Sequence, residues 1–377
     1  MSLFSQPGSR LDRLDSLRGI AILAVIVHHL AIFDAPAGLA GRLYVSLAEF
    51  FSHGVDLFFV LSGFLLVKTL PLSPQPGWLT GFWVRRVAKI LPLYALVVAG
   101  VFLIAPALLA LAGLTTKAET LRQGAADWPW HALFATNWLF FRTGEFTHPL
   151  LNVAWSLGVE VQFYGLLSIA WLAGWARSPR FWLVLAAVAV ASRCAGVALG
   201  WNWVSLLNFT PGRLDAFAAG ALVALRPGWF TRPVRLLGAA VLFAPLVLVW
   251  SREVLWLQTL GYTWVALGAA VAVRGAAVPT PATAVAPRRA PLVFLGCISY
   301  SVYLTHIAVR SGVRDLLVPA DLVPGSAPYW AAHVVYGVIV ITCSAFFGWV
   351  VWRVVEAPAQ SFLLSRLRPA TPPRKLD

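Results

Sequence analysis

The run Leu17–Leu30 reads LRGIAILAVIVHHL, an apolar stretch with an arginine near its start and two histidines near its end. In hydrocarbon, a polar group without a partner is costly, so ionisable residues inside such runs are candidates for function. Eleven residues separate Arg18 from His29, which is about 20° past three full helical turns. The two side chains therefore share one helix face, about 16 Å apart along the axis.

We expect His29 to lie near the middle of the bilayer and Arg18 near its cytoplasmic surface. A neutral imidazole at that depth can serve as a general base. Two plainer interpretations remain open. Arg18 could be a positive anchor at the helix start, and His29 a core histidine bonded to a neighbouring helix. His28 points about 80° away from His29, and for it a structural role is favoured.

A second polar stripe occurs in the stretch 152–166, NVAWSLGVEVQFYGL. Ser156, Glu160 and Tyr164 are four residues apart and share a helix face, with Trp155 beside them. If this helix enters from the outside, Glu160 lies about 13 Å deep, level with His29. We expect Glu160 to orient His29 and to stabilise its protonated form. The alternative is a structural carboxylate satisfied by an arginine or by hydroxyl groups.

The apolar run near residue 300 also carries polar groups on one side. Four of them fall within about 60° of one another on a helix: Ser299, Tyr303, His306 and Arg310. Such a face cannot look at lipid, so we expect it to line the same cavity nearer the outside. Asp56 begins another apolar run and is either a ligand-binding residue or a helix-start acid. Further down the same run, Ser62-Gly63 permits close helix packing.

The stretch FWVRRVAKILPLY places Arg85, Arg86 and Lys89 before an apolar run. Basic groups at a helix start suit a phosphate-bearing ligand, and lipid headgroups are the alternative. The sequence shows no Walker-type loop, no G-x-S-x-G elbow and no HExxH, and no metal is expected. Cys194, Cys297 and Cys343 lie within apolar runs, where we expect unpaired core residues.

Composition indicates a membrane protein. The 377 residues are 59% hydrophobic and 12% charged, against about 25% charged in a soluble domain. The net charge is +14, but the basic residues sit in short loops between apolar runs, which favours a positive-inside bias over nucleic-acid binding. The start of the chain also resembles a signal peptide ending at Ala35-Pro36-Ala37, but the two histidines argue against that.

Ten apolar runs predict an all-α fold of about ten transmembrane helices around a central cavity: 16–33, 54–70, 91–113, 151–174, 181–200, 213–226, 234–250, 256–273, 291–310 and 330–353. The segment 131–141 is too short to span and is expected to be interfacial or re-entrant. With ten spans and a cytoplasmic N-terminus, 20 of the 29 Lys and Arg lie inside; an eleventh span lowers this to 13. Both termini are then cytoplasmic.

Seven stretches together resemble the acyltransferase-3 family of integral membrane acyltransferases: LDSLRGIAILAVIVHH, GVDLFFVLSGFLL, RRVAKILPLY, AWSLGVEVQFY, RLDAFAAG, GCISYSVYLTH and VEAP. The resemblance covers the first helix to the last. It implies a membrane domain at 1–356, followed by a basic, proline-rich cytoplasmic tail at 357–377 that we expect to be unstructured. We expect the membrane to be the bacterial inner membrane.

The resemblance implies transfer of an acyl group, usually acetyl, from cytoplasmic acetyl-CoA to an acceptor at the outer face. Arg18 and His29 match residues regarded as essential, with Arg18 holding the donor. Arg85 and Arg86 match arginines thought to handle CoA. We also expect Arg213 and Asp215, from RLDAFAAG, to bind substrate. The other expected substrate-binding residues are Asp56, Trp155, Ser156, Tyr164, Ser299, Tyr303 and His306. The family commonly has a second acid where Val161 stands, so Glu160 would act alone.

The family often carries an extracytoplasmic hydrolase-like domain. We expect none here, so that the membrane part or a separate protein would complete the transfer. The acceptor would be a hydroxyl of a sugar, polysaccharide or glycolipid, or a small glycosylated product such as a macrolide. An acyl-enzyme on His29 is a variant of the mechanism. The rival functions are a secondary transporter with a buried His/Glu proton relay and an interaction protein without chemistry.

Overall fold

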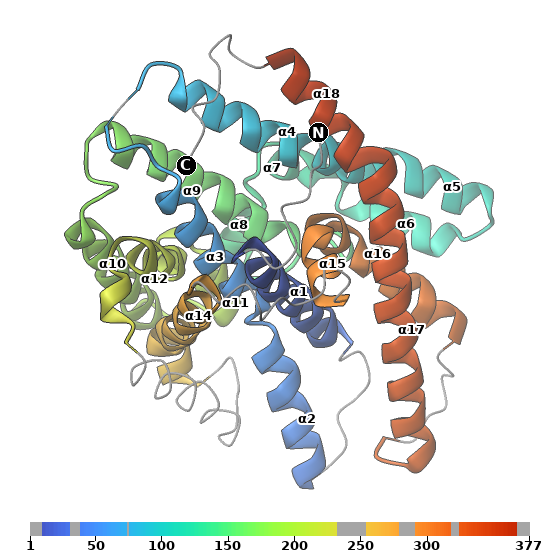
Figure 1. Ribbon diagram of the computed structural model, residues 1–377. Helices are drawn as coiled ribbons and strands as arrows, with labels where there is room; N and C mark the ends of the chain where they lie inside the picture. Colours follow the sequence, from blue (N-terminus) through green and yellow to red (C-terminus); the bar gives the residue numbers. More distant parts are fainter. Residues whose placement is uncertain are drawn as a thin grey trace.

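The computed structural model describes residues 10–30, 38–73, 75–231, 254–278, 291–317 and 324–367, and all regular elements within these ranges are helices (Figure 1). The predicted all-α fold is therefore confirmed. The seventh predicted span, 234–250, lies outside the described residues, as does the possible cleavage site near Ala37.

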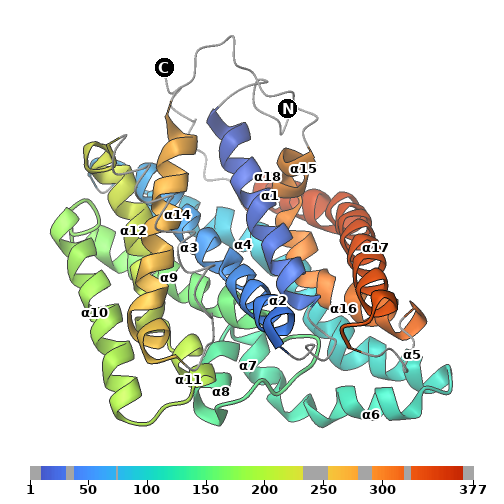
Figure 2. The same cartoon turned by 90° about the horizontal axis from the view of Figure 1, so that it is seen from below.

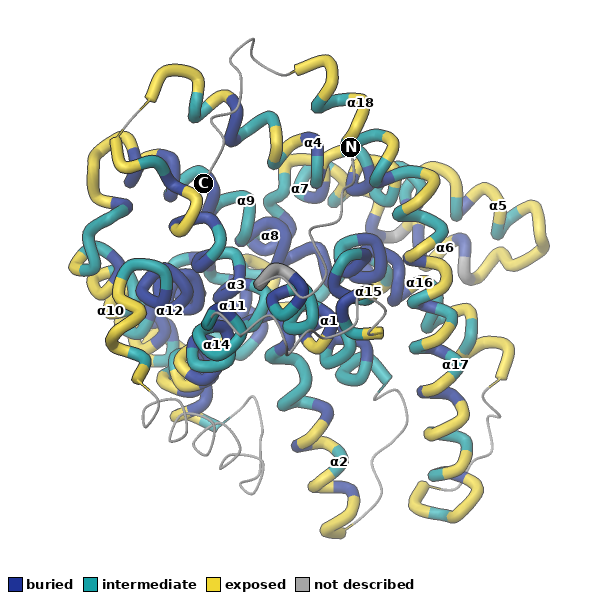
Figure 3. Tube along the Cα trace, in the orientation of Figure 1, coloured by how far each residue is buried: buried dark blue, intermediate teal, exposed yellow. Residues whose placement is uncertain are grey.

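A central group of helices contains about half of the buried residues (Figure 3). Its members are α1 (Arg10–His29), α3 (Gly54–Lys68), α9 (Ala154–Leu172), α12 (Leu214–Leu225) and α14 (Leu257–Gly261 as a π-helical start, then Tyr262–Ala277). Helices α3 and α12 touch at two glycines. A Cβ on Gly63 would lie 2.1 Å from the Phe217 carbonyl oxygen, and one on Gly220 would lie 2.0 Å from that of Val60. The close approach expected at Ser62-Gly63 is confirmed, and it fixes α3 against α12.

Gly63→Ala is expected to lower the thermal stability of the protein clearly, because the added methyl group collides with backbone rather than with a movable side chain. Overpacking of this kind costs about 1–3 kcal/mol. Gly165→Ala, on α9, is the matched control, since a Cβ there meets nothing within 4 Å. Thermal unfolding in detergent, followed by tryptophan fluorescence, measures both; equal melting temperatures would contradict the close α3–α12 contact.

The ninth predicted span is not a straight helix. It consists of α15 (Pro291–Cys297) and α16 (Ser299–Leu317), bent by 89° at the break between them. Close glycine contacts hold α15 against α1, because a Cβ on Gly296 would meet the Asp15 carbonyl oxygen at 1.8 Å. The bend turns α16 away from this contact and toward the end of α1, where His29 lies.

The peripheral helices that follow or flank the predicted spans differ from them at their ends. They are α2 (Gly38–Phe51), α4 (Trp78–Ala99, continued by the π-helix Gly100–Ile104), α5 (Ala105–Leu111), α10 (Pro179–Ala198), α17 (Ala327–Val351, continued by the π-helix Trp352–Glu356) and α18 (Ala357–Leu367). Helix α2 was not predicted. Helix α4 begins at Trp78, so the basic cluster lies within it rather than before it. The tail was expected to be unstructured, but residues 357–367 form α18.

Short helices gather at one end of the molecule, opposite α15 and the start of α1 (Figure 2). They are α6 (Thr115–Gln123), the 3-10 turn Ala125–Asp127, α7 (Trp128–Ala132), α8 (Thr136–Thr143), α11 (Trp203–Asn208) and the 3-10 turn Thr210–Arg213; a further 3-10 turn, Pro227–Trp229, follows α12. Segment 131–141 is divided between α7 and α8, and neither is long enough to cross a membrane. The prediction that it does not span is confirmed.

Five helical stretches in the described residues are long and apolar enough to cross a membrane, or six if the bent α15–α16 pair counts as one span. The chain is thus a multi-pass membrane protein, and the predicted number of ten is not confirmed. Many large apolar side chains are exposed on the outward faces, among them Val334, Val338 and Phe346 of α17. Exposed apolar side chains on long helices suit contact with lipid.

Candidate active site

Two cavities lie among the central helices. The first, here the histidine cavity, has a volume of about 260 Å³ and is lined by residues that include His28, His29, Asp56, Trp155, Arg213, Tyr262, Tyr303 and Arg310. The second, here the glutamate cavity, has a volume of about 300 Å³ and is lined by residues that include Arg18, Ser62, Arg86, Lys89, Ser156, Glu160, Tyr164, Ser299 and Tyr303. The predicted single central cavity is therefore replaced by two. Helix α1 contributes Arg18 to one and His29 to the other.

The imidazole of His29 is oriented by its own helix and by α16. Its Nδ1 lies 2.8 Å from the Val25 carbonyl oxygen, which can only accept a hydrogen bond, so Nδ1 carries the proton. In the neutral ring this leaves the lone pair on Nε2. His306 has the same tautomer, because its Nδ1 lies 2.7 Å from the Tyr303 carbonyl oxygen. The His306 Nε2 then lies 3.4 Å from the His29 Nδ1.

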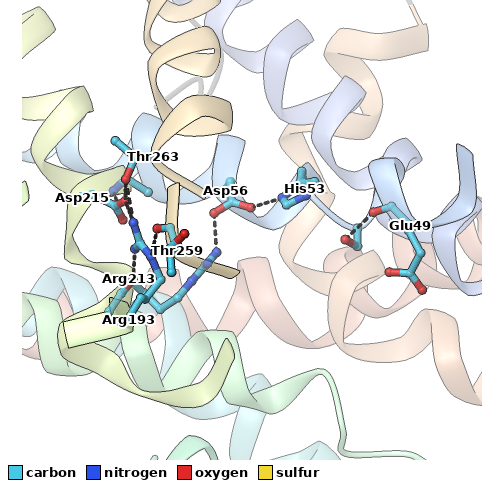
Figure 4. A network of polar contacts seen from close by, with 11 residues as sticks. Glu49, His53, Asp56, Arg193, Arg213, Asp215, Thr259 and Thr263 are labelled. Atoms are coloured by element: carbon cyan, nitrogen blue, oxygen red, sulfur yellow. Dashed lines mark hydrogen bonds and ion pairs between the residues drawn. The ribbon is translucent and has the colours of Figure 1, made fainter. Parts of the chain in front are cut away.

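A buried ion pair between Arg213 and Asp56 lines the histidine cavity, and Figure 4 shows its polar contacts. The Arg213 guanidinium donates to Asp56 Oδ1, and His53 Nδ1 donates to Asp56 Oδ2 over 2.6 Å. Arg213 is 1% exposed and its guanidinium carbon lies 4.0 Å from the centre of the Tyr262 ring. Its Nε and Nη1 are buried without hydrogen-bond partners in the described part of the chain. Arg213 can therefore still donate to a ligand oxygen in this cavity.

A second buried pair lies beside the first. Arg193 Nη2 donates to Asp215 Oδ2 over 2.9 Å and to the Thr263 hydroxyl over 2.6 Å, and Thr263 donates to the same carboxylate oxygen. Arg193 also donates to the carbonyl oxygens of Gly212 and Thr259. These bonds fix the turn that ends at Arg213. Asp215 was expected to bind substrate, but the structure engages it with Arg193 and Thr263.

Glu160 lies in the glutamate cavity, where Ser62 donates to its Oε1 over 2.6 Å and Tyr164 donates to the same oxygen over 2.7 Å. The prediction that Glu160 orients His29 is therefore wrong. Glu160 and His29 line different cavities, and Val25 and His306 orient the imidazole instead. The alternative interpretation of Glu160, a carboxylate satisfied by hydroxyl groups, matches its observed partners.

The predicted basic cluster reaches the glutamate cavity only in part. Arg86 and Lys89 line it, and Arg85 does not. Lys89 forms an ion pair with Glu356, whose other oxygen accepts from Ser301. Arg18 lies in the same cavity and pairs with Asp15 at 2.8 Å. Arg86 Nε is buried with no hydrogen-bond partner in the ranges described, so it is free to bind a ligand oxygen.

A sequence profile of an acyltransferase domain matches residues 11–349, which include every residue of both cavities named above. This chain belongs to the acyltransferase-3 family.

Relatives of this acyltransferase-3 chain are O-acetyltransferases by name. The peptidoglycan O-acetyltransferase OatA of Listeria monocytogenes is 30% identical over 45% of the chain and 26% of its own length. A putative O-acetyltransferase of Staphylococcus aureus is 24% identical over 92% of the chain and 56% of its own length. The putative peptidoglycan O-acetyltransferase YrhL of Bacillus subtilis is 31% identical over 40% and 22%, respectively. The chain thus spans about half or less of these relatives, and no solved structure matches it.

Sequence reasoning missed several residues of the acyltransferase-3 site. Arg193 stands alone in an apolar run, which is itself a sign of a buried functional or structural charge. Tyr262 and His53 gave no comparable signal, because their importance comes from facing Arg213 and Asp56 in space. The cysteines are free, as expected, but none is buried in the core: Cys194 is exposed, and Cys297 and Cys343 are half-buried. Within the described ranges, no cluster of three metal-ligating side chains occurs.

The end of this acyltransferase-3 domain where the short helices gather contains a buried histidine pair, with ring centres 6.1 Å apart: His131 of α7 and His148 of the loop after α8. Burial lowers the pKa of His131 from 6.5 to about 4, and burial likewise lowers the pKa of His148 from 6.5 to about 4. Above pH 6.5 both rings are neutral in the folded and unfolded states. Between pH 6.5 and 4 only the unfolded state takes up these protons, so stability falls as the pH falls through this window.

We therefore expect the melting temperature to decrease between pH 6.5 and 4, and expect the double variant His131→Phe/His148→Gln to decrease less. Glutamine keeps an acceptor for the backbone N–H groups of Leu150 and Leu151, which His148 Nδ1 accepts at 3.2 and 3.3 Å. Melting curves of both proteins across this range provide the measurement. Parallel pH profiles would show that the histidine pair is not responsible.

Proposed function

We propose that this chain is a membrane O-acyltransferase that moves an acetyl group from cytoplasmic acetyl-CoA to a hydroxyl of a glycan or glycolipid at the outer face. The observation that carries the proposal is the His29 imidazole, which lines a cavity with its Nε2 lone pair left free by the Nδ1 hydrogen bond. A hydroxyl group in this cavity could give its proton to Nε2. The glycan acceptor is supported by relatives that are named peptidoglycan O-acetyltransferases.

The donor occupies the glutamate cavity in this proposal, with its phosphates near Arg86 and Arg18. Guanidinium groups bind phosphate oxygens well because they offer several donors in a planar fork. Lys89 is held toward the cavity by Glu356, and the Lys89–Glu356 pair is neutral overall. Arg86 therefore carries the main electrostatic role, and Arg85, outside the cavity, does not share it.

In the proposed reaction, His29 alone accepts and returns the proton. The acceptor oxygen attacks the thioester carbonyl carbon while Nε2 takes the hydroxyl proton, giving an imidazolium. The C–S bond then breaks, and the imidazolium proton goes to the departing thiolate, which restores the neutral ring and releases CoA as its thiol. Arg310 lines the same cavity and places positive charge near the oxyanion that forms, and Arg213, although paired with Asp56, has N–H groups left to donate to it.

The alternative function, a secondary transporter, has one supporting observation, the bent α15–α16 pair. Broken helices frame substrate sites in many transporters. The match to an acyltransferase domain along most of the chain favours the enzyme.

Cys297 offers a test of the donor site, because it lines the glutamate cavity. In a Cys194→Ala/Cys343→Ala background it is the remaining thiol, and we expect CoA to slow its alkylation by N-ethylmaleimide by at least several-fold. Arg86→Ala should weaken this protection, and Arg85→Ala should leave it unchanged. Absence of protection by CoA, together with absence of acetyl-CoA turnover by the purified protein, would refute the proposed function.

A further inference from the structure

The two cavities meet at two side chains. Val55 of α3 and Tyr303 of α16 line both the histidine cavity and the glutamate cavity. Ser156 lines the glutamate cavity and Val153 lines the histidine cavity, and the Tyr303 hydroxyl contacts both. It donates to the Val153 carbonyl oxygen over 2.9 Å and lies 2.6 Å from Ser156 Oγ. Tyr303 thus stands at the boundary between the two cavities.

We propose that Val55 and Tyr303 form a constriction through which the acyl end of the donor passes to reach His29, and that this constriction limits the length of the acyl chain. The inference rests on the proposed function, because it assumes a donor in the glutamate cavity and a base in the histidine cavity. The inference assigns a role in acyl specificity to Val55 and Tyr303. Val55 has no polar group, so its role would come from the size of its side chain.

The chemistry of the two sides determines which part of the donor crosses. The glutamate cavity holds the cations Arg18 and Arg86, which suit the phosphates of CoA. The thioester end is uncharged and narrow, and beside the boundary it meets Phe58, whose ring centre lies 6.3 Å from that of Tyr303. A charged nucleotide would lose its hydration and its arginine partners by entering this boundary. The acyl end is therefore the part that can pass.

The constriction is rigid on both sides. The Tyr303 ring is held by its two hydroxyl contacts, to Ser156 of α9 and to Val153, which directly precedes α9. Val55 is followed by Asp56, whose carboxylate is fixed by Arg213 and His53. Because neither side can move without breaking buried polar contacts, the opening depends on the size of the side chain at position 55. A rigid opening can distinguish acyl groups by length, at about tenfold or more per methylene group.

A photoreactive donor tests the path without requiring a known acceptor. The purified full-length chain is incubated with an acyl-CoA that carries a short alkyl-diazirine acyl group, irradiated and mapped by mass spectrometry. In the wild-type protein we expect labels on residues of the histidine cavity, such as Val25 and Ile307. In Val55→Trp we expect the labels to shift to residues of the glutamate cavity, such as Phe58 and Leu157, while CoA still protects Cys297.

Chain length provides the second readout. Val55→Ala is expected to raise the rate of hexanoyl-CoA turnover relative to acetyl-CoA by about tenfold. Tyr303→Phe keeps the ring but loses its hydroxyl contacts and should relax the preference in the same direction. Val67→Ala makes the same change on the same helix, at a buried position outside both cavities, and should leave the ratio unchanged.

The outcomes separate the two hypotheses. If CoA fails to protect Cys297 in the Cys194→Ala/Cys343→Ala background, the donor site and this inference both fail. If protection is normal but Val55→Trp labels the histidine cavity as strongly as the wild type does, the constriction is refuted and the proposed function stands. Unchanged acyl preference in both Val55→Ala and Tyr303→Phe would also refute the constriction.

Discussion

His29→Ala is expected to abolish acetyl transfer while the protein still accumulates in the membrane and still binds CoA. The variant removes the group that takes the acceptor proton, and loss of a general base lowers rates by about 100- to 10,000-fold. Few contacts are lost, because the His29 ring bonds to its own helix at Val25 and to one neighbour, His306. Mass spectrometry of cell-envelope glycans from cells that express each variant measures the transfer.

The matched control is His28→Ala. The His28 Nδ1 lies 2.8 Å from the Ala48 carbonyl oxygen on α2, so its loss should reduce stability more than transfer. Protection of Cys297 by CoA shows that each variant is folded and binds donor. Glycan acetylation at the wild-type level in a well-expressed His29→Ala variant would end the general-base mechanism.

Asp56→Ala is expected to destabilise the protein by about 3–5 kcal/mol, the usual cost of removing one partner from a buried ion pair. The side chains of Asp56 and Arg213 are 3% and 1% exposed, so the variant leaves a buried guanidinium without its carboxylate. The double variant Asp56→Leu/Arg213→Met removes both charges and should recover most of the lost stability. The transfer activity of the double variant should remain low, because the guanidinium of Arg213 is then absent from the histidine cavity.

An exposed ion pair is the control for this experiment. Arg122 and Glu119 are 53% and 62% exposed and 4.0 Å apart, and such pairs contribute little to stability. Glu119→Ala should therefore change the melting temperature only slightly. If Asp56→Ala were as stable as Glu119→Ala, the pair would not be desolvated in the folded protein.

The sequence predicted the positions of polar residues best where those residues lie on one helix. The eleven-residue spacing of Arg18 and His29 predicts two polar groups at different depths of α1, and the structure places them in two separate cavities. This holds because both residues are positioned by the geometry of a single helix. The same reasoning placed Ser156, Glu160 and Tyr164 on one face of α9, and all three line one cavity.

The pairing of Glu160 with His29 failed because depth is only one coordinate of a residue in a membrane. Which helices are neighbours is decided by packing contacts between distant segments, such as Gly63 against Phe217 and Gly296 against Asp15. These contacts put α3 and α16 between the two residues, with Tyr303 at the boundary. A run of apolar residues predicts that a helix forms, but it does not predict which other helix packs against it.

The sequence predicted the apolar centres of helices better than their ends. Hydropathy located the apolar part of α4, but the helix begins at Trp78, and this brings Arg86 and Lys89 to the cavity while Arg85 lies outside it. Helix α2 was not predicted, because its 14 residues are too few to span a membrane and include Arg42 and Glu49.

By itself, the sequence determined three things: the all-α membrane fold, the resemblance to the acyltransferase-3 family, and the faces of α1, α9 and α16 that carry polar groups. These follow from composition and from the local geometry of single helices. Only the tertiary structure decided that there are two cavities, that His306 rather than Glu160 adjoins His29, and that Arg213 pairs with Asp56. Those contacts join residues more than 150 positions apart, and local periodicity carries no information about them.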